Sequence, residues 1–386
     1  MTTRLSLFAV VFALGGCCLE VVSETGSGPG ASAETSSTGP TCGSGGLTSA
    51  GGTSGGASGC AVPARGPIAV TTLAGNGVAG FFDGSGGRAG STEFHTPWNV
   101  AVDAIGNVYV ADIGNARIRK VAPDGSTITV AGNGTPGNQD GTGGPNGTAE
   151  FAFPEALALD STGNILVVDD DYSTPSIIRR VEPSGNVTTR PVMGLDFSDA
   201  LGIAITEAGN ILLADSGNHR VAVINSSGNA TILASDASLD PTGLAVGPDG
   251  SVYFADFSGN VIRKIDMAGN VTTVAGNDSI GFGFADGPAS DAQFDGPIAL
   301  AVDPQGNVVV ADWNNDRIRR IDVTGYVTTL AGNGQGSGEA DGTGGANGTA
   351  EFAGPRGVSI DAACNLYVAD DGNNRIRKIT FGTPPP

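Results

Sequence analysis

One sequence phrase occurs six times along this chain and constrains the fold more than any other feature. In the clearest copy, Pro97–Val121, an apolar run is followed by the turn Gly106-Asn107. A second apolar run and a basic, apolar run complete the copy. The second runs of the six copies end at Asp112, Asp169, Asp215, Asp256, Asp312 and Asp370. These aspartates are 57, 46, 41, 56 and 58 residues apart, so each copy fits one small β-sheet. This spacing and strand content predict a β-propeller or an open array.

A fourth strand distinguishes a closed ring from an open array. A short apolar strand such as Val327–Gly332 follows the third strand of most copies, but the sixth copy lacks one. A matching strand, Val70–Gly75, stands alone before the first copy. We therefore expect it to pair with Asn374–Ile379 and complete the last blade, because this leaves no open sheet edge. The predicted fold is all-β, a six-bladed β-propeller with four-stranded blades.

The repeated phrase resembles that of the NHL family, whose six-bladed propellers carry apolar-Asp, Gly-Asn, Val-Ala-Asp and Asn-x-Arg in this order. The resemblance covers residues 67–381. The long Gly-Asn-Gly and Asp-Gly-x-Gly loops are similar to those of teneurins and of bacterial surface proteins. Copies two to four depart locally, with Ile177 and Val261 in place of an arginine and Ala200 in place of the opening proline. The resemblance implies a scaffold for contacts, since most NHL propellers bind partners and few catalyse.

The first residues have the order of a secretory signal. Arg4 precedes the apolar run Leu5–Leu14, and Leu14-Gly15-Gly16-Cys17 follows. The run is too short to span a bilayer, which needs about 20 residues. The segment resembles a bacterial lipoprotein signal, which implies acylation of Cys17; ordinary cleavage nearby is the alternative. We expect an exported protein, anchored by lipid alone at the bacterial outer membrane or cell surface.

Composition divides the chain into four parts. Residues 18–66 consist largely of Gly, Ser, Thr and Ala with few large apolar residues. Such a segment buries too little surface to offset its ordering entropy, so we expect a flexible linker. The expected parts are a signal peptide at 1–17, this linker, the propeller at 67–381 and a Pro-rich tail at 382–386.

The cysteines suggest a staple for the ring. Cys364 occupies a turn position that is glycine in other copies, such as Gly106. In a propeller blade this turn lies at the same end as the start of the fourth strand, and Cys60 stands a few residues before that start in the closing strand. We therefore expect a disulfide between Cys60 and Cys364. A bond between Cys42 and Cys60 within the linker is the alternative.

The formal net charge of −20 limits the partners. Nucleic-acid binding rests on a basic face that neutralises phosphates, so we expect no nucleic-acid partner. An acidic exported domain suits divalent cations, cationic ligands or simple solubility. We expect a monomer that binds a protein, peptide or glycan of the cell envelope.

Four long loops between copies share an Asp-Gly step, and each places a phenylalanine three residues before the next proline. The steps begin at Asp83, Asp140, Asp286 and Asp341, and the phenylalanines are Phe94, Phe151, Phe294 and Phe352. We interpret the phenylalanines as anchors between blades and Asp-Gly as a turn signal. Calcium is the alternative, but it draws six to eight oxygen ligands, and no loop has alternating carboxylates. No cofactor or metal site is predicted.

Catalysis has little support. His95 and His219 are the two histidines of the chain, so a three-histidine zinc site cannot be built. The serines lack a nucleophile elbow. Glu155 is the one carboxylate at the start of an innermost strand. The sequence predicts a binding module without catalytic activity; a hydrolase or lyase with a divalent metal in the central channel is the alternative.

The mouth of the channel is the predicted binding surface. The first residues of the innermost strands and the turns between strands two and three should meet there, and the copies differ at these positions. The candidates are Trp98, Glu155, Tyr172, His219, Phe257, Trp313 and Arg356. Exposed aromatic residues beside a few charges make a contact surface; ordinary partly covered loop residues are the alternative. The six repeated aspartates are expected to be structural, accepting hydrogen bonds from turn amides or third-strand arginines.

Overall fold

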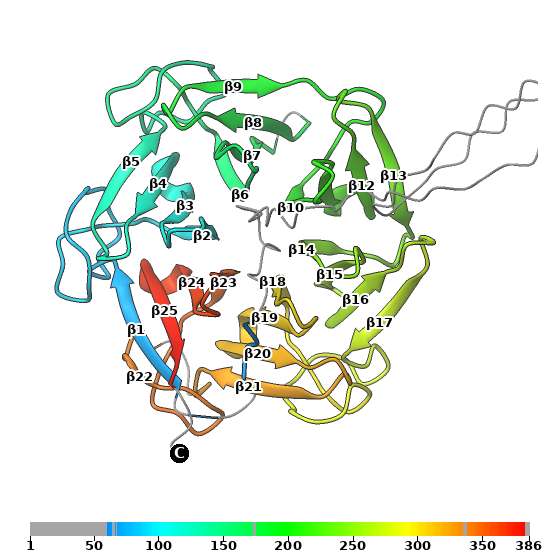
Figure 1. Cartoon of the computed structure of the whole chain (residues 1–386). Helices are drawn as coiled ribbons and strands as arrows, with labels where there is room; N and C mark the ends of the chain where they lie inside the picture. Colours follow the sequence, from blue (N-terminus) through cyan, green and yellow to red (C-terminus); the bar gives the residue numbers. More distant parts are fainter. Residues whose placement is uncertain (1–59, 64–65, 67, 173–174, 335–337, 383–386) are drawn as a thin grey trace, which may run out of the picture. The chain divides into compact units, whose positions relative to one another are not determined.

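The computed structural model describes residues 60–63, 66, 68–172, 175–334 and 338–382. The signal peptide, Cys17 and nearly all of the linker lie outside the described residues. Within them the chain forms twenty-five strands and four 3-10 helices of three residues each. The strands make six antiparallel sheets arranged around a centre, so the chain is an all-β, six-bladed propeller as predicted (Figure 1).

Five blades use their strands in chain order from the centre outward, and in the last blade β1 follows β23, β24 and β25 as the outer strand. The innermost strands are β2 (Pro97–Val102), β6 (Phe153–Leu159), β10 (Ala200–Ile205), β14 (Pro241–Val246), β18 (Pro297–Val302) and β23 (Pro355–Ile360). The second strands are β3 (Val108–Asp112), β7 (Ile165–Asp170), β11 (Ile211–Asp215), β15 (Val252–Asp256), β19 (Val308–Asp312) and β24 (Leu366–Asp370). The third strands are β4 (Arg117–Val121), β8 (Ile177–Val181), β12 (Arg220–Ile224), β16 (Val261–Ile265), β20 (Arg317–Ile321) and β25 (Arg375–Phe381).

The outer strands are β5 (Thr127–Ala131), β9 (Val187–Arg190), β13 (Ala230–Ser235), β17 (Val271–Ala275), β21 (Val327–Ala331) and β1 (Ile68–Ala74). A two-residue strand, β22 (Gly342–Thr343), lies outside β1. The 3-10 helices η1 (Ile113–Asn115), η2 (Ser216–Asn218), η3 (Trp313–Asn315) and η4 (Asp371–Asn373) follow second strands. Each ends in a residue with a left-handed backbone, which turns the chain back into the third strand.

The ring closes through its own N-terminal strand. β1 pairs antiparallel with β25, from Ile68 opposite Phe381 to Ala74 opposite Ile376. Figure 1 shows the blue strand β1 beside the red strand β25, so the two ends of the propeller share one blade. The predicted closure is confirmed, and β1 leaves the third strand of the last blade with no open edge.

The core lies between adjacent blades because both faces of each sheet are covered. Phe151, for example, packs with Ile118 of the first blade and Leu157 of the second. The four loop phenylalanines are at most 1 % exposed, which confirms their role as anchors between blades. Their burial fixes each long loop against the sheet that follows it.

The six repeated aspartates are structural, as predicted. Each is at most 2 % exposed and accepts a hydrogen bond from a backbone N–H ahead of the innermost strand of its own blade. Each also pairs with an arginine of the third strand; the pairs are Asp112–Arg119, Asp169–Arg179, Asp215–Arg220, Asp256–Arg263, Asp312–Arg319 and Asp370–Arg377.

The aspartates of the Asp-Gly steps have a role that the sequence did not suggest. Each forms an ion pair with a fully buried third-strand arginine; the pairs are Asp83–Arg119, Asp140–Arg179, Asp286–Arg319 and Asp341–Arg377. The glycine after each aspartate bridges to the outer strand of the blade that follows the loop. The Asp-Gly step therefore holds its long loop against a sheet, through an ion pair with a buried arginine and a bridge to the outer strand.

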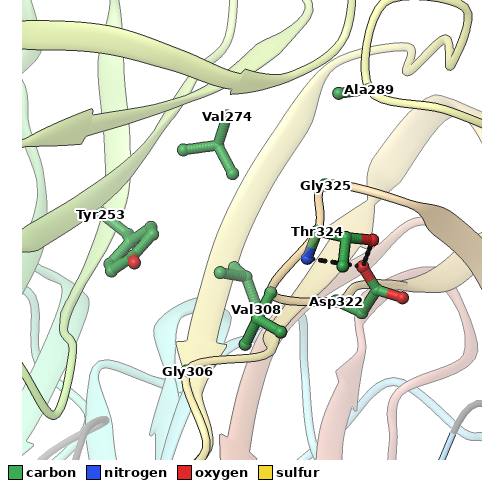
Figure 2. A pocket seen from close by; sticks show the side chains of 9 residues that line it. Tyr253, Val274, Ala289, Gly306, Val308, Asp322, Thr324 and Gly325 are labelled. Carbon is green, nitrogen blue, oxygen red and sulfur yellow. Dashed lines mark hydrogen bonds between the residues drawn. The ribbon is translucent and has the colours of Figure 1, made fainter.

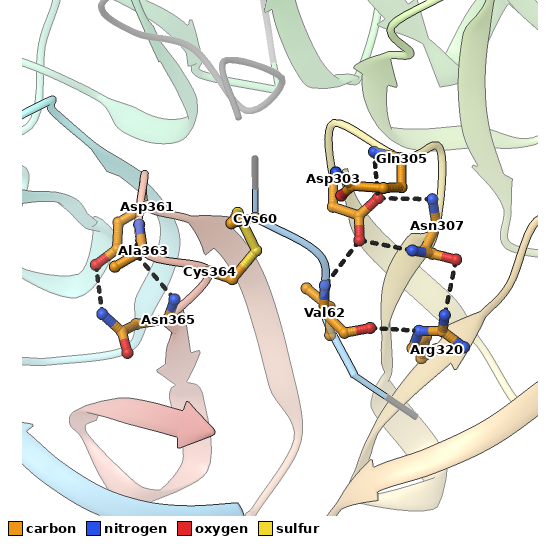
Figure 3. The surroundings of a disulfide bond; sticks show 10 residues. All are labelled: Cys60, Val62, Asp303, Gln305, Asn307, Arg320, Asp361, Ala363, Cys364 and Asn365. Atoms are coloured by element: carbon orange, nitrogen blue, oxygen red, sulfur yellow. Dashed lines mark hydrogen bonds between the residues drawn. A yellow bond between two sulfur atoms is a disulfide. The ribbon is translucent and has the colours of Figure 1, made fainter. Parts of the chain in front are cut away.

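A disulfide joins Cys60 to Cys364, with Cα atoms 5.7 Å apart (Figure 3). This is the pairing that the sequence favoured. Cys364 has φ +63° in the turn between β23 and β24, a conformation that glycine adopts in the other copies. The chain next to Cys60 is also held by blade five, because the Val62 N–H donates to Asp303 Oδ2 at 2.9 Å and Arg320 Nε donates to the Val62 carbonyl at 2.8 Å. Disulfides of this kind are typical of exported proteins.

Candidate binding surface at the channel mouth

The register of the sheets brings the candidate residues to one end of the propeller. Pro97 pairs with Asp112, and Pro297 pairs with Asp312, so the start of each innermost strand lies beside the end of the second strand. The 3-10 turn after the second strand therefore lies at the same end as the first innermost residues. We call this end the channel mouth.

A stacked group of Trp98, Trp313 and Arg356 lies at the channel mouth, and we call it the Trp–Arg stack. Arg356 Cζ is 3.5 Å from the centroid of the Trp98 ring and 4.5 Å from that of Trp313. Arg356 Nε also donates to Asp371 Oδ2 at 2.6 Å. Phe257 extends the group, with its ring centroid 6.0 Å from that of Trp313. The side chains of Trp98, Trp313 and Arg356 are partly exposed. Blades one, five and six therefore present one aromatic, cationic surface.

A small cavity lies beside this stack. The space enclosed by Trp98, Leu201, Ile298 and Arg356 with their neighbours is about 10 Å³, room for about one water molecule. This cavity is too small to hold a ligand larger than water.

Three carboxylates form a second group, between blades two and three. One oxygen from each of Glu155, Asp170 and Asp199 lies within 4.8 Å of the others, and we call these residues the acidic cluster. Glu155 is fully buried, Asp170 is 2 % exposed, and Asp199 is half-buried. The Tyr172 hydroxyl donates to Glu155 Oε1, and Ser176 Oγ donates to Asp170 Oδ2 at 2.6 Å.

Electrostatics in the acidic cluster disfavour three negative charges. Burial raises the pKa of Glu155 to about 8; the Tyr172 hydrogen bond opposes this shift, and the charges of Asp170 and Asp199 add to it. Burial, with the charge of Asp170, also raises the pKa of Asp199 above its ordinary value. Glu155 is thus a buried group and not part of the exposed surface, where the sequence analysis had placed it.

The remaining candidates lie apart from the Trp–Arg stack. Tyr172 is 62 % exposed and contacts the ring of Phe153, with centroids 5.0 Å apart. His219 is exposed, and its Nδ1 bonds with the carbonyl of Leu239 at 2.7 Å. Both residues have φ near +55°, and His219 directly precedes the third strand β12. The structure therefore unites Trp98, Trp313, Arg356 and Phe257, and it joins Glu155 to Tyr172.

Sequence reasoning missed Asp170, Asp199 and Asp371. Asp170 directly follows the repeated Asp169, and Asp199 directly precedes the innermost strand β10. The available signal for Asp170 and Asp371 was a second carboxylate directly after a repeated aspartate, and for Asp199 it was a carboxylate directly before an innermost strand. These carboxylates can be recognised as a cluster only when the positions of the neighbouring blades are known.

A larger pocket lies elsewhere, between blades four and five (Figure 2). It has a volume of about 230 Å³, and Tyr253, Val274, Val308 and Asp322 are among the residues that line it. Thr324 donates to the Asp322 carboxylate through its N–H at 2.8 Å and its hydroxyl at 2.6 Å. The Asp322 carboxylate is thus engaged within its own turn.

Comparisons with known proteins agree with the fold. The NHL repeat family matches residues 197–224 and 294–321, and the chain carries NHL repeats on a six-bladed propeller. The Arabidopsis thaliana protein SUPPRESSOR OF QUENCHING 1, chloroplastic, is 30 % identical over 278 residues, which cover 66 % of this chain. The match spans 22 % of that much longer protein.

Solved propellers with different roles share the architecture. An auxiliary nutrient binding protein from Bacteroides ovatus superposes with a TM-score of 0.65 at 18 % identity, over 83 % of this chain and 78 % of that one. Virginiamycin B lyase from Staphylococcus aureus superposes with a TM-score of 0.51 at 17 % identity, over 82 % and 100 %. Likeness at this level shows the fold alone. Within the described residues, no helix has the length and apolar character needed to cross a membrane.

Proposed function

We propose that this NHL-repeat propeller is an exported, membrane-anchored binding module without catalytic activity of its own, and that the Trp–Arg stack is its contact surface. The observation that carries the proposal is the placement of Arg356 between two partly exposed tryptophans. Tryptophan and arginine are the residues that most often dominate binding energy at interfaces. The partner is a protein, peptide or glycan of the cell envelope.

The stack has the rigidity that a contact surface needs. Arg356 is held by two rings and by the Asp371 carboxylate, so little side-chain freedom remains to be lost when a partner binds. A flat, prepared surface of this kind suits a macromolecular partner better than a small molecule, which needs a concave site.

The similar solved propellers include a binding protein, which supports a binding role, and an enzyme. One of the similar propellers is called an auxiliary nutrient binding protein and another is a lyase. The alternative of a hydrolase or lyase with a divalent metal in the channel has one observation in its favour, the acidic cluster.

Replacing both tryptophans by alanine should abolish binding while leaving the propeller folded. We expect Trp98→Ala with Trp313→Ala to lower the affinity for a captured partner by about thirtyfold or more, because hot-spot residues contribute at least about 2 kcal/mol. The measurement is capture of the purified chain on immobilised envelope glycans and fractionated envelope proteins. Tyr326→Ala, at an aromatic residue that is 46 % exposed and lies on the turn between β20 and β21, is the matched control.

Two results would contradict this assignment. Binding that survives the double substitution would mean that the contact surface lies elsewhere. A large loss of thermal stability would mean that the tryptophans are packing residues, because truncation of a buried aromatic residue costs about 3–5 kcal/mol whereas surface changes usually stay within about 0.5 kcal/mol.

Anchoring is proposed to depend on Cys17, which lies outside the described residues. We expect Cys17→Ala to move the protein from the detergent phase to the aqueous phase on fractionation, because the acyl chains would be lost. Cys18→Ala is the control and should stay in the detergent phase. Equal partitioning of Cys17→Ala and the unaltered protein would exclude the lipid anchor. The residue after Cys17 is not acidic, which by resemblance to lipoprotein sorting implies delivery to the outer membrane.

A further inference from the structure

The acidic cluster is assembled by two neighbouring blades. Glu155 lies near the start of β6, Asp170 ends β7, and Asp199 directly precedes β10. Ser176 Oγ ties these segments together, since it donates to Asp170 Oδ2 at 2.6 Å and accepts from the Ala200 N–H at 3.1 Å. The fold therefore holds the three carboxylates beside one another through fixed backbone positions.

Glu155 contributes a buried, unsatisfied carboxylate oxygen to this group. Its side chain is fully buried, and Oε2 has no hydrogen-bond partner within the described part of the chain, while Oε1 accepts from Tyr172. A buried oxygen without a partner loses its hydration and gains nothing in exchange. In a native protein such an atom indicates a missing ligand, a water molecule or an ion.

The cluster also lacks the ion pair with an arginine that each of the six repeated aspartates forms. Asp112, Asp312 and Asp370 each pair with a third-strand arginine. Among the described residues, no lysine, arginine or histidine forms an ion pair with Glu155, Asp170 or Asp199. The charge of Arg356 acts on Glu155 without a direct ion pair, and three converging carboxylates that lack such a pair favour the uptake of protons or a cation.

We infer that the acidic cluster binds one hard divalent cation of the calcium and magnesium class, through oxygens of Glu155, Asp170 and Asp199. The cluster offers carboxylate oxygens with neither histidine nor cysteine, and such ligands select calcium, magnesium or manganese over zinc. The half-buried Asp199 leaves one side open to water molecules, which complete the coordination of such ions. This inference is independent of a partner at the Trp–Arg stack.

Calorimetric titration of the full chain, stripped of metal with a chelator, tests the site directly. We expect one calcium or magnesium ion to bind per chain, and zinc to bind more weakly. Glu155→Gln and Asp199→Asn should each weaken calcium binding by about tenfold or more, because affinity follows the charge of the ligands. Asp316→Asn is the matched control: Asp316 is a half-buried carboxylate that accepts from the Gly354 N–H at 2.7 Å and lies outside the cluster.

Thermal unfolding separates loss of the site from loss of the fold. In chelator, Glu155→Gln should melt no lower than the unaltered chain, because the substitution relieves repulsion between carboxylates. Added calcium should raise the melting temperature of the unaltered chain and of Asp316→Asn, but not that of Glu155→Gln. Absence of saturable calcium and magnesium binding at millimolar concentration would overturn the inference. Tighter binding of zinc, or calcium binding that survives both cluster substitutions, would also overturn it.

Discussion

A chain that begins at Gly77 is expected to aggregate or to melt far below a chain that begins at Cys60. The truncation removes β1, the outer strand of the last blade. β25 would then present its unpaired N–H and C=O groups along one edge, and such edges pair with other chains.

The expected loss is comparable to the stability of a whole domain. Ile68, Val70 and Leu73 are 7 %, 1 % and 9 % exposed, and each contributes about 1.5–3 kcal/mol through burial. Together they account for about 5–9 kcal/mol, whereas a typical domain is stable by about 5–15 kcal/mol. Thr72 adds a hydrogen bond to Asp341 at 2.8 Å, which connects the closing strand to the last long loop. The loss of all these contacts would remove most of the free energy of unfolding of a typical domain.

A third chain, beginning at Pro67, separates the strand from the disulfide. It lacks Cys60 and Val62 but keeps β1, so we expect it to remain monodisperse and to melt at an intermediate temperature. Size-exclusion chromatography and thermal unfolding of the three chains provide the measurements. If the chains beginning at Cys60 and Gly77 melted at the same temperature, β1 would not close the ring.

The closure could be predicted from sequence because it follows from local repetition. A strand of the type Val-Thr-Thr-Leu-Ala-Gly occurs after several copies, so its absence after Ile379 and its presence at Val70–Gly75 are visible without a structure. The buried phenylalanines were predictable for the same reason. Repetition reveals what every blade shares.

The acidic cluster could not be predicted, because it depends on what two blades place side by side. Asp170 and Asp199 are 29 residues apart and belong to different blades. Glu155 was expected at an exposed mouth, yet the Tyr172 ring and the neighbouring blade cover it. Likewise, the pairing of Asp286 with Arg319 joins a loop to a strand 33 residues later, and no turn pattern encodes it.

Arg319→Met is expected to destabilise the propeller by about 3–5 kcal/mol, because it leaves a buried carboxylate without its cation. Arg319 is fully buried; it donates to Asp312 Oδ2 at 2.6 Å and to Asp286 Oδ1 at 2.7 Å. It also donates to the Ala285 and Gln293 carbonyls. Methionine fills part of the volume of the arginine side chain. The loss of stability therefore reports mainly the cost of a buried Asp312 charge that has no cation. Reversible urea unfolding is the measurement.

Two further variants decide whether charge or packing carries this effect. Arg180→Met removes an arginine whose ion pair with Glu182 is exposed, and it should cost less than about 1 kcal/mol because water screens such pairs. Adding Asp312→Asn to Arg319→Met should restore part of the stability, since the amide oxygen still accepts from the Asp295 N–H without a buried charge. If the double variant were no more stable than Arg319→Met alone, loss of packing around Phe294 would explain the effect instead.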